Sequence, residues 1–97
     1  MVKHIVFWNL LDEAEGRTKK ENAMLIKAGL ERLVGIVDGL LSMHVGEGFG
    51  EGWDLCLVSD FVSKEALEAY QTHPEHMKVR ELVKKVRTDR VICDYEY

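Results

Sequence analysis

The chain contains a single proline, Pro74, and this residue constrains the fold more than any other. Proline lacks a backbone N–H and its ring clashes with the preceding turn, so it breaks a helix interior but fits the first helical turn. The residues on both sides of Pro74 have helical periodicity. We therefore predict one helix over Lys64–Gln71, with Ser63 as its N-cap, and a second helix that begins at Pro74.

The segment around the break also gathers polar residues that can carry chemistry. Thr72 and Glu75 have the spacing of a capping box, and His73 directly precedes Pro74, where an N-cap residue is expected. The apolar stripe of the second helix, extended back by one turn, meets His76. That stripe consists of Val79, Leu82, Val83 and Val86.

The first segment, Val2–Leu10, is rich in β-branched and aromatic residues and predicts a strand. Because side chains alternate along a strand, large apolar groups lie on both of its faces, which is typical of a strand covered on both sides. One cover can be helices, and the other a second subunit. One face carries His4, Val6, Trp8 and Leu10, and the other carries Ile5 and Phe7.

The middle of the chain predicts one helix and two strands. Thr18 and Glu21 form a capping box, and the helix that follows should end near Gly39. Its expected stripe is Ala23, Ile26, Leu30, Leu33, Val34 and Val37. Leu40–Val45 predicts a strand with Leu41, Met43 and Val45 on one face. Trp53–Phe61 predicts another, with Trp53, Leu55, Leu57, Ser59 and Phe61 on one face.

Four glycines between Gly46 and Gly52 predict a mobile hairpin loop, since a phosphate-binding loop would need a helix after it and a strand follows instead. The segment before the first helix, Leu11–Arg17, is predicted to be a loop, and Arg90–Tyr97 is predicted to be a final strand.

The element order predicts an α+β, ferredoxin-like βαββαβ subunit with an antiparallel sheet and a broken second helix. We expect one domain over residues 1–97, with the first strand between the third and the fourth.

Composition excludes several classes of protein. The chain is 46% hydrophobic and 31% charged, with a net charge of −4, which argues against a nucleic-acid-binding surface. We interpret the basic cluster Lys84, Lys85, Arg87 and Arg90 as a solvated helix end. No signal peptide or membrane-spanning run is visible, so we expect no membrane association.

The two cysteines, Cys56 and Cys93, both fall in predicted strands. With the first strand between them they should lie about 9–10 Å apart, beyond the reach of a disulfide. We expect both thiols to be reduced, buried among apolar groups and unreactive, and the protein to be cytoplasmic.

Taken together, four segments resemble one family, the stress-responsive A/B barrel domain (Dabb) proteins. They are VKHIVFW, DLCLVSDF, EALEAYQTHPEH and the closing DYEY, and the resemblance spans essentially the whole chain. It implies a dimeric α+β barrel in which the sheets of two subunits pair. The plant polyketide cyclases of this family imply an intramolecular aldol reaction without a metal or organic cofactor. Their working histidines and tyrosine correspond to His4, His76 and Tyr70.

The candidate site follows from these residues. Neutral imidazole can remove an acidic proton and imidazolium can stabilise an enolate oxygen, so His4 and His76 are candidate catalytic residues, with Tyr70 near the cavity rim to orient a carbonyl group. Trp8, Leu57 and Phe61 are candidate substrate-binding residues. The alternative interpretation is that both histidines are residues of the core.

Two classes of function remain open at this stage. One is a cofactor-free acid/base enzyme, a cyclase or isomerase acting on a small carbonyl or polyketide-like compound. The other is a non-catalytic homodimer that binds a small apolar ligand or has a stress-related structural role. Monooxygenases on related barrels are a weaker analogy. A metal site at His73 and His76 lacks further ligands, so we expect no metal and no cofactor.

Overall fold

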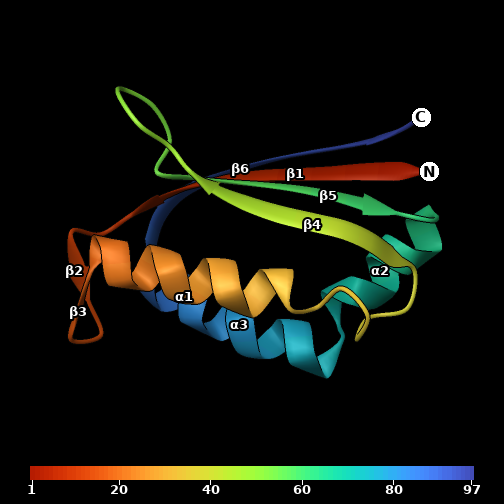
Figure 1. Cartoon of the computed structure of the whole chain (residues 1–97), viewed down its shortest axis with the longest axis horizontal. Coiled ribbons are helices and arrows are strands. Elements are labelled where there is room, and N and C mark those ends of the chain that lie inside the picture. Colours follow the sequence, from red (N-terminus) through yellow and green to blue (C-terminus); the bar gives the residue numbers. More distant parts are fainter.

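The computed structural model describes residues 1–97 and has two layers, a four-stranded antiparallel sheet and a layer of helices against one of its faces (Figure 1). The strand order in the sheet is β4-β5-β1-β6, so β1 lies between β5 and β6 as predicted. In chain order the elements are β1 (Val2–Leu10), β2 (Glu13–Ala14), β3 (Arg17–Thr18), α1 (Lys19–Glu31), β4 (Leu40–Glu47), β5 (Leu55–Phe61), α2 (Lys64–Gln71), α3 (Pro74–Val86) and β6 (Arg87–Glu96).

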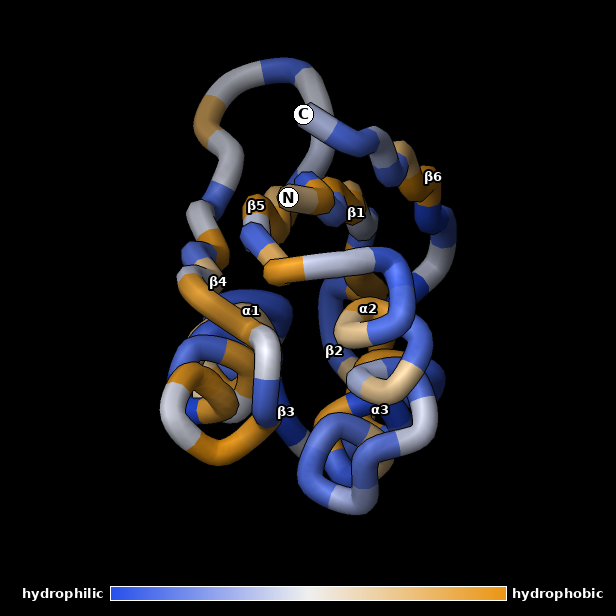
Figure 2. Tube along the Cα trace, turned by 90° about the vertical axis from the view of Figure 1, so that its right-hand side faces the viewer, coloured by the Kyte–Doolittle hydropathy of each residue, from blue (hydrophilic) through white to orange (hydrophobic).

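The helices divide the covered face of the sheet between them. Viewed along the layers, α1 lies under the β4 side of the sheet, and α2 and α3 lie under the other side (Figure 2). Nineteen buried hydrophobic residues form one core cluster between the layers. Strand β6 extends past this cover, and its residues from Thr88 onward are exposed in the single chain. None of the helices has the length and apolar composition needed to cross a lipid bilayer.

Strand β1 alternates as predicted. Its even-numbered residues are buried against the helices, and its odd-numbered residues are half-buried on the opposite, open face of the sheet. The strand pairs with β5 on one side and β6 on the other, so both of its edges are hydrogen-bonded. His4 therefore enters the space between the layers, while Ile5 and Phe7 point away from it.

The predicted first helix is too long, because α1 ends at Glu31 rather than near Gly39. Gly35 and Gly39 both have positive φ, and residues 32–39 form a series of tight turns. Leu33 still reaches the core from these turns, whereas Val34 is exposed, so a single stripe through residue 37 is wrong. The Thr18–Glu21 capping box is confirmed.

Three strand predictions are corrected as well. A register irregularity between Leu40 and Ser42 buries Leu40 and exposes Leu41. Strand β5 begins at Leu55, and Trp53 instead packs against Phe7 on the open face, with ring centroids 6.1 Å apart. The loop expected before α1 contains the short hairpin β2–β3, and β6 begins at Arg87, three residues early.

The helix break at Pro74 is confirmed. Helix α2 covers Lys64–Gln71 with Ser63 as its N-cap, and α3 begins at Pro74. The N-cap of α3 is His73, whose Nδ1 accepts the backbone N–H of Glu75 at 3.1 Å. The Thr72–Glu75 capping box does not form, because the imidazole has taken its place.

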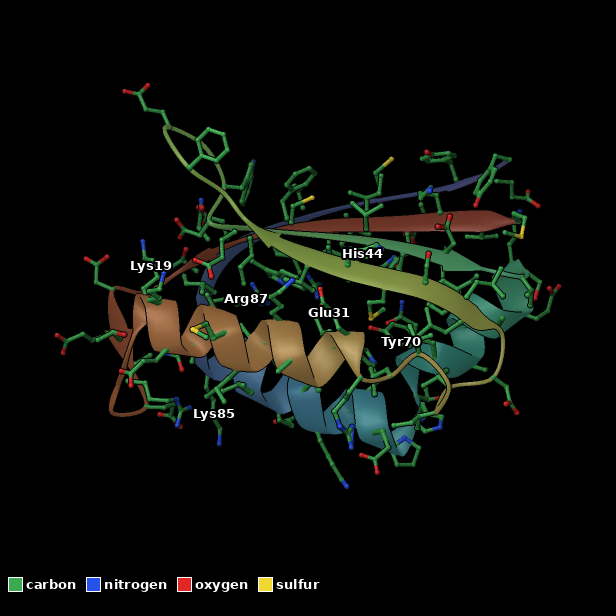
Figure 3. The ribbon with its side chains drawn as sticks, viewed as in Figure 1. Lys19, Glu31, His44, Tyr70, Lys85 and Arg87 are labelled. Carbon is green, nitrogen blue, oxygen red and sulfur yellow. The ribbon has the colours of Figure 1, made fainter.

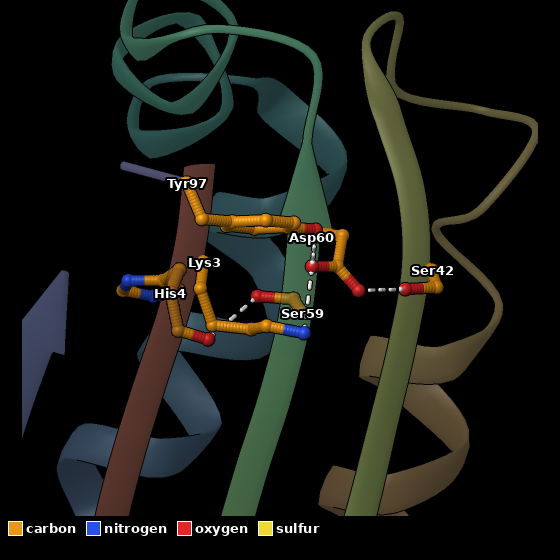
Figure 4. Close-up of polar contacts among 6 residues, drawn as sticks. All are labelled: Lys3, His4, Ser42, Ser59, Asp60 and Tyr97. Carbon is orange, nitrogen blue, oxygen red and sulfur yellow. Dashed lines mark hydrogen bonds and ion pairs between the residues drawn. The ribbon is translucent and has the colours of Figure 1, made fainter. Parts of the chain in front are cut away.

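A polar cluster at one end of the open face attaches the end of the chain to the sheet (Figure 4). The Asp60 carboxylate accepts hydrogen bonds from Ser42 Oγ at 2.7 Å and from the Tyr97 hydroxyl, and Lys3 Nζ lies 2.8 Å from it. The Lys3 hydrogen bond, followed by those of Tyr97 and Ser42, lowers the pKa of Asp60 to about 2. The open face is therefore polar at this end and apolar beyond it.

Both cysteines are free thiols, in agreement with the predicted absence of a disulfide. Cys56 is half-buried, and burial raises the pKa of its thiol. Cys93 is exposed in the single chain, so one subunit alone does not provide the predicted burial of this thiol. Because β6 has no helix beneath it and the open face has no cover, nothing within one chain buries Cys93.

Gly39 gives a test of how the turn before β4 positions α2. Its φ is +81°, and a Cβ at this position would lie 2.6 Å from the Cβ of Ala66 in α2. Gly35 has a similar φ of +89° with open space around it. We expect Gly35→Ala to lower the free energy of unfolding by about 1–2 kcal/mol through backbone strain alone. Gly39→Ala should lower the free energy of unfolding by more than this, as measured by urea denaturation. Equal losses in the two variants would contradict the close approach of Gly39 to α2.

Candidate functional site

A cavity of about 160 Å³ lies between the sheet and α3. Its walls come from β1, β5 and β6 on the sheet side and from α1, α2 and α3 on the helix side. The polar lining residues are His4, Tyr70, Gln71, His76, Arg80 and Arg90. The apolar lining residues are Val6, Trp8, Leu30, Leu57, Val83 and Ile92.

Tyr70 joins the two histidines. Its ring stacks on that of His76, with centroids 3.9 Å apart and an interplanar angle of 31°, and contacts the His4 ring edge-on at 6.2 Å. Tyr70 is 1% exposed and lies between α2 and the sheet (Figure 3), so it forms the inner wall of the cavity and not its rim. The structure thus brings together His4, Tyr70 and His76, the three residues that the sequence analysis gave as candidate catalytic residues.

His76 is held in the form of a neutral base. Its Nδ1 lies 3.4 Å from the carbonyl oxygen of Gln71, and because a carbonyl only accepts hydrogen bonds, Nδ1 carries the proton and Nε2 is left free. Burial, together with the nearby charges of Arg80 and His4, lowers the pKa of His76. Burial also raises the pKa of Tyr70 far above its ordinary value, so its hydroxyl keeps its proton.

His4 is oriented by a residue that the sequence analysis missed. Its Nδ1 contacts the carboxylate of Asp94 on the neighbouring strand β6, and its backbone oxygen accepts a hydrogen bond from Ser59 Oγ at 3.0 Å. A carboxylate on Nδ1 fixes the tautomer and turns Nε2 away, toward the cavity side of the ring. The predicted strand order put the last strand beside β1, but the register that places Asp94 opposite His4 is defined only by the structure.

Only two of the three predicted substrate-binding residues line the cavity. Trp8 and Leu57 line the cavity, whereas Phe61 lies behind Tyr70, with ring centroids 5.1 Å apart, and supports the wall from outside. Arg80 and Arg90 also line the cavity, although neither was singled out as a site residue. The interpretation of Arg90 as part of a solvated helix end is wrong, because it belongs to β6.

The two histidines considered as metal ligands, His73 and His76, do not face a common site. His73 uses its Nδ1 to cap α3, while His76 faces the cavity from the next turn. No group of three or more histidine, cysteine, aspartate or glutamate side chains in the structure is arranged to hold a metal ion.

Comparison with known proteins places the chain in a family. The model of the stress responsive A/B barrel domain matches residues 2–97. The chain belongs to this family. No match was found among curated proteins.

Solved structures similar to this Dabb protein have the same fold over nearly its whole length. A dimeric protein of unknown function from Bacteroides fragilis is 27% identical, with a TM-score of 0.82 and coverage of 99% of this chain and 95% of that one. A dimeric ferredoxin-like protein from Thermobifida fusca is 20% identical, with a TM-score of 0.84 and coverage of 99% and 90%. Hydroxynitrile lyase from Passiflora edulis is 18% identical, with a TM-score of 0.77 and coverage of 97% and 90%.

The His76 environment predicts a pH dependence of stability. Its folded-state pKa is lowered from 6.5, so the unfolded chain binds more protons as the pH falls through 6.5. The stability that comes from keeping His76 neutral is fully present above pH 6.5. It is lost as the pH falls toward the folded-state pKa. We expect His76→Asn to lose less stability than the wild type between pH 7.5 and pH 5.5 in urea titrations.

The matched control for this experiment is His44→Asn, since His44 is exposed on β4. This variant should lose as much stability as the wild type between pH 7.5 and pH 5.5. NMR titration of the His76 ring gives the pKa directly. A midpoint at or above 6.5 would contradict the burial of the imidazole.

Proposed function

We propose that this Dabb protein is a cofactor-free acid/base enzyme that acts on a small carbonyl compound, as a cyclase, isomerase or lyase. The observation that carries the proposal is the contact of two histidine rings with one buried tyrosine at a single cavity. Each imidazole has its Nδ1 engaged, by Gln71 or by Asp94, so the Nε2 atoms are the ones available to a ligand.

The two histidines suit different roles. His76, whose pKa is lowered, is neutral near pH 7 and can accept a proton at Nε2 from the carbon beside a carbonyl group. The electron pair left on that carbon moves onto the carbonyl oxygen. When a second proton binds at Nε2 of His4, the pairing of Nδ1 with the Asp94 carboxylate balances the added charge, and Nε2 can donate a hydrogen bond to this oxygen and stabilise it.

The outcome depends on what the enolate meets next. Return of the proton from His76 to a different atom gives an isomerisation, and attack of the enolate carbon on a second carbonyl of the same molecule gives an aldol cyclisation. Cleavage of a 2-hydroxynitrile is related chemistry, because a base must remove the hydroxyl proton as cyanide leaves. A structural neighbour named as a hydroxynitrile lyase supports including that class.

The size and walls of the cavity support a small substrate. A buried apolar space of about 150 Å³ accommodates a molecule the size of benzene, and this cavity has about 160 Å³. Trp8, Leu57 and Val83 can contact the apolar part of such a substrate. Both histidines are buried, and exclusion of bulk water strengthens the hydrogen bonds that act on the reacting atoms.

The second candidate function is that of a non-catalytic protein that binds a small ligand. It is favoured by the same apolar walls and by the absence of an acidic side chain among the residues that line the cavity. The two functions differ in whether protons move, so an exchange experiment separates them.

The exchange of α-protons for deuterium, followed by NMR in D₂O on a panel of small ketones, keto acids and 2-hydroxynitriles, tests catalysis without a known substrate. We expect His76→Ala to lower the exchange or cleavage rate by about 10²–10⁴-fold, and His4→Ala nearly as much, while the fold is kept. Asp94→Asn should lower the rate less than His4→Ala does, because the ring remains but loses its orienting carboxylate.

The control is His44→Ala, which removes an exposed histidine and should leave every rate unchanged. Absence of any enzyme-dependent exchange or cleavage across the panel, or rates that are indifferent to His76→Ala, would overturn the catalytic proposal. The binding function would then be the one supported.

We also infer that two copies of the chain pair through the open face of the sheet. Two cross-strand rows of apolar side chains cover this face, and apart from Trp53, which packs against Phe7, no helix or strand of the same chain covers them. Contiguous apolar surface of this kind marks a protein interface. The B. fragilis and T. fusca neighbours are both described as dimeric. The rows are Val58, Ile5 and Cys93, and Cys56, Phe7 and Val91.

A charge at the centre of this face should separate the subunits. We expect the wild type to sediment as a dimer at micromolar concentration and Phe7→Asp to sediment as a monomer. Met24→Asp, at an exposed position of α1, is the matched control and should remain dimeric. Cys93 should react slowly with a thiol reagent in the wild type and rapidly in Phe7→Asp. A monomeric wild type with rapidly labelled Cys93 would contradict the inference.

A further inference from the structure

We propose that the cavity selects anionic ligands, and in particular small carboxylates, through Arg80 and Arg90. This deepens the proposed function and rests on it, because it names the substrate class of the same cavity: carbonyl compounds that also carry a carboxylate.

The two arginines line the cavity from different elements. Arg80 lies on α3 one turn after His76 and is half-buried, and Arg90 lies on β6 and is exposed. Neither takes part in the ion pairs or side-chain hydrogen bonds of the chain, in which other basic residues such as Lys3, Lys27 and Arg32 are engaged. Both therefore keep their hydrogen-bond donors for a ligand or for water.

The charge of the cavity wall is opposite to that of the whole chain. The chain has 17 acidic and 13 basic residues, yet no aspartate or glutamate is among the residues that line the cavity. The carboxylate of Asp94, which contacts the cavity residue His4, is already paired with that histidine. Because the opposing charges are absent from the wall, the field inside favours an anion.

Trp8 supplies a second and independent observation. Its side chain is 6% exposed and lines the cavity, and its indole Nε1 is buried without a hydrogen-bond partner. A buried N–H donor left unpaired is costly, so a shift of the indole that brings Nε1 to an acceptor atom of a ligand would be favoured. Trp8 pairs with Arg90 in the β1–β6 ladder, so the indole and one guanidinium share one region of the wall.

These donors match a carboxylate better than other anions. A guanidinium presents a planar pair of N–H groups that fits the two oxygens of a carboxylate. The remaining wall is apolar, formed by residues such as Leu30, Leu57 and Val83, and it favours an organic ligand over inorganic phosphate. A carboxylate held by the arginines would leave the rest of a small molecule beside His4 and His76.

Benzoate, benzamide and inorganic phosphate are the probes, because benzamide has the shape of benzoate without its charge. Binding is followed by the NMR signal of the Trp8 indole N–H in a Trp53→Phe background, which leaves one tryptophan. We expect benzoate to bind at least about tenfold more tightly than either of the others, and Arg80→Gln or Arg90→Gln to weaken it by about tenfold or more. Arg90→Lys should bind with intermediate affinity.

The control variant is Arg32→Gln, since Arg32 lies outside the cavity and pairs with Glu75, and it should bind benzoate as the wild type does. Equal affinity for benzoate and benzamide, or no effect of either cavity arginine, would overturn the proposal. Equal affinity for phosphate would overturn the choice of carboxylate.

These outcomes are distinct from those of the exchange experiment. Loss of charge selectivity with His76-dependent exchange intact would refute only the anionic substrate class. Charge-selective binding without any exchange would refute catalysis while leaving a carboxylate-binding site.

Discussion

The structure depends on the pairing of β1 along both of its edges. Strand β1 is central in the sheet, and its pleat sends His4, Val6 and Trp8 into the core and Ile5 and Phe7 to the open face. A shift of one residue in either register would exchange these two sets. The cavity and the apolar open face are therefore two consequences of one alignment, and any change to β1 affects both.

The alternation of β1, the end points of α2 and the start of α3 could be read from the sequence because each has a strong local cause. Strand periodicity, an N-cap serine and the single proline act within a few residues. The end of α1 could not be read in this way, because Leu33 and Val37 keep helical spacing while Gly35 turns the backbone. Periodicity indicates which side chains are buried, but it does not indicate whether a helix or a series of turns positions them.

The site was only partly predictable for a related reason. His4, Tyr70 and His76 come from segments with a family resemblance, but the contacts that give them roles join distant parts of the chain. Asp94 is 90 residues from His4 in sequence. The character of the wall depends on which side chains lack partners, as Trp8 and Arg90 do, and absence of a partner leaves no trace in a local pattern.

The central claim is that the space between His4, His76 and the cavity arginines is a ligand site and not packed core. A crystal structure of the protein soaked with a small keto acid tests it most directly. The account predicts ligand density in the cavity, with the carbonyl group between the two imidazoles and the carboxylate toward Arg80 and Arg90. A cavity filled by protein side chains, or ligand found only outside it, would contradict the account.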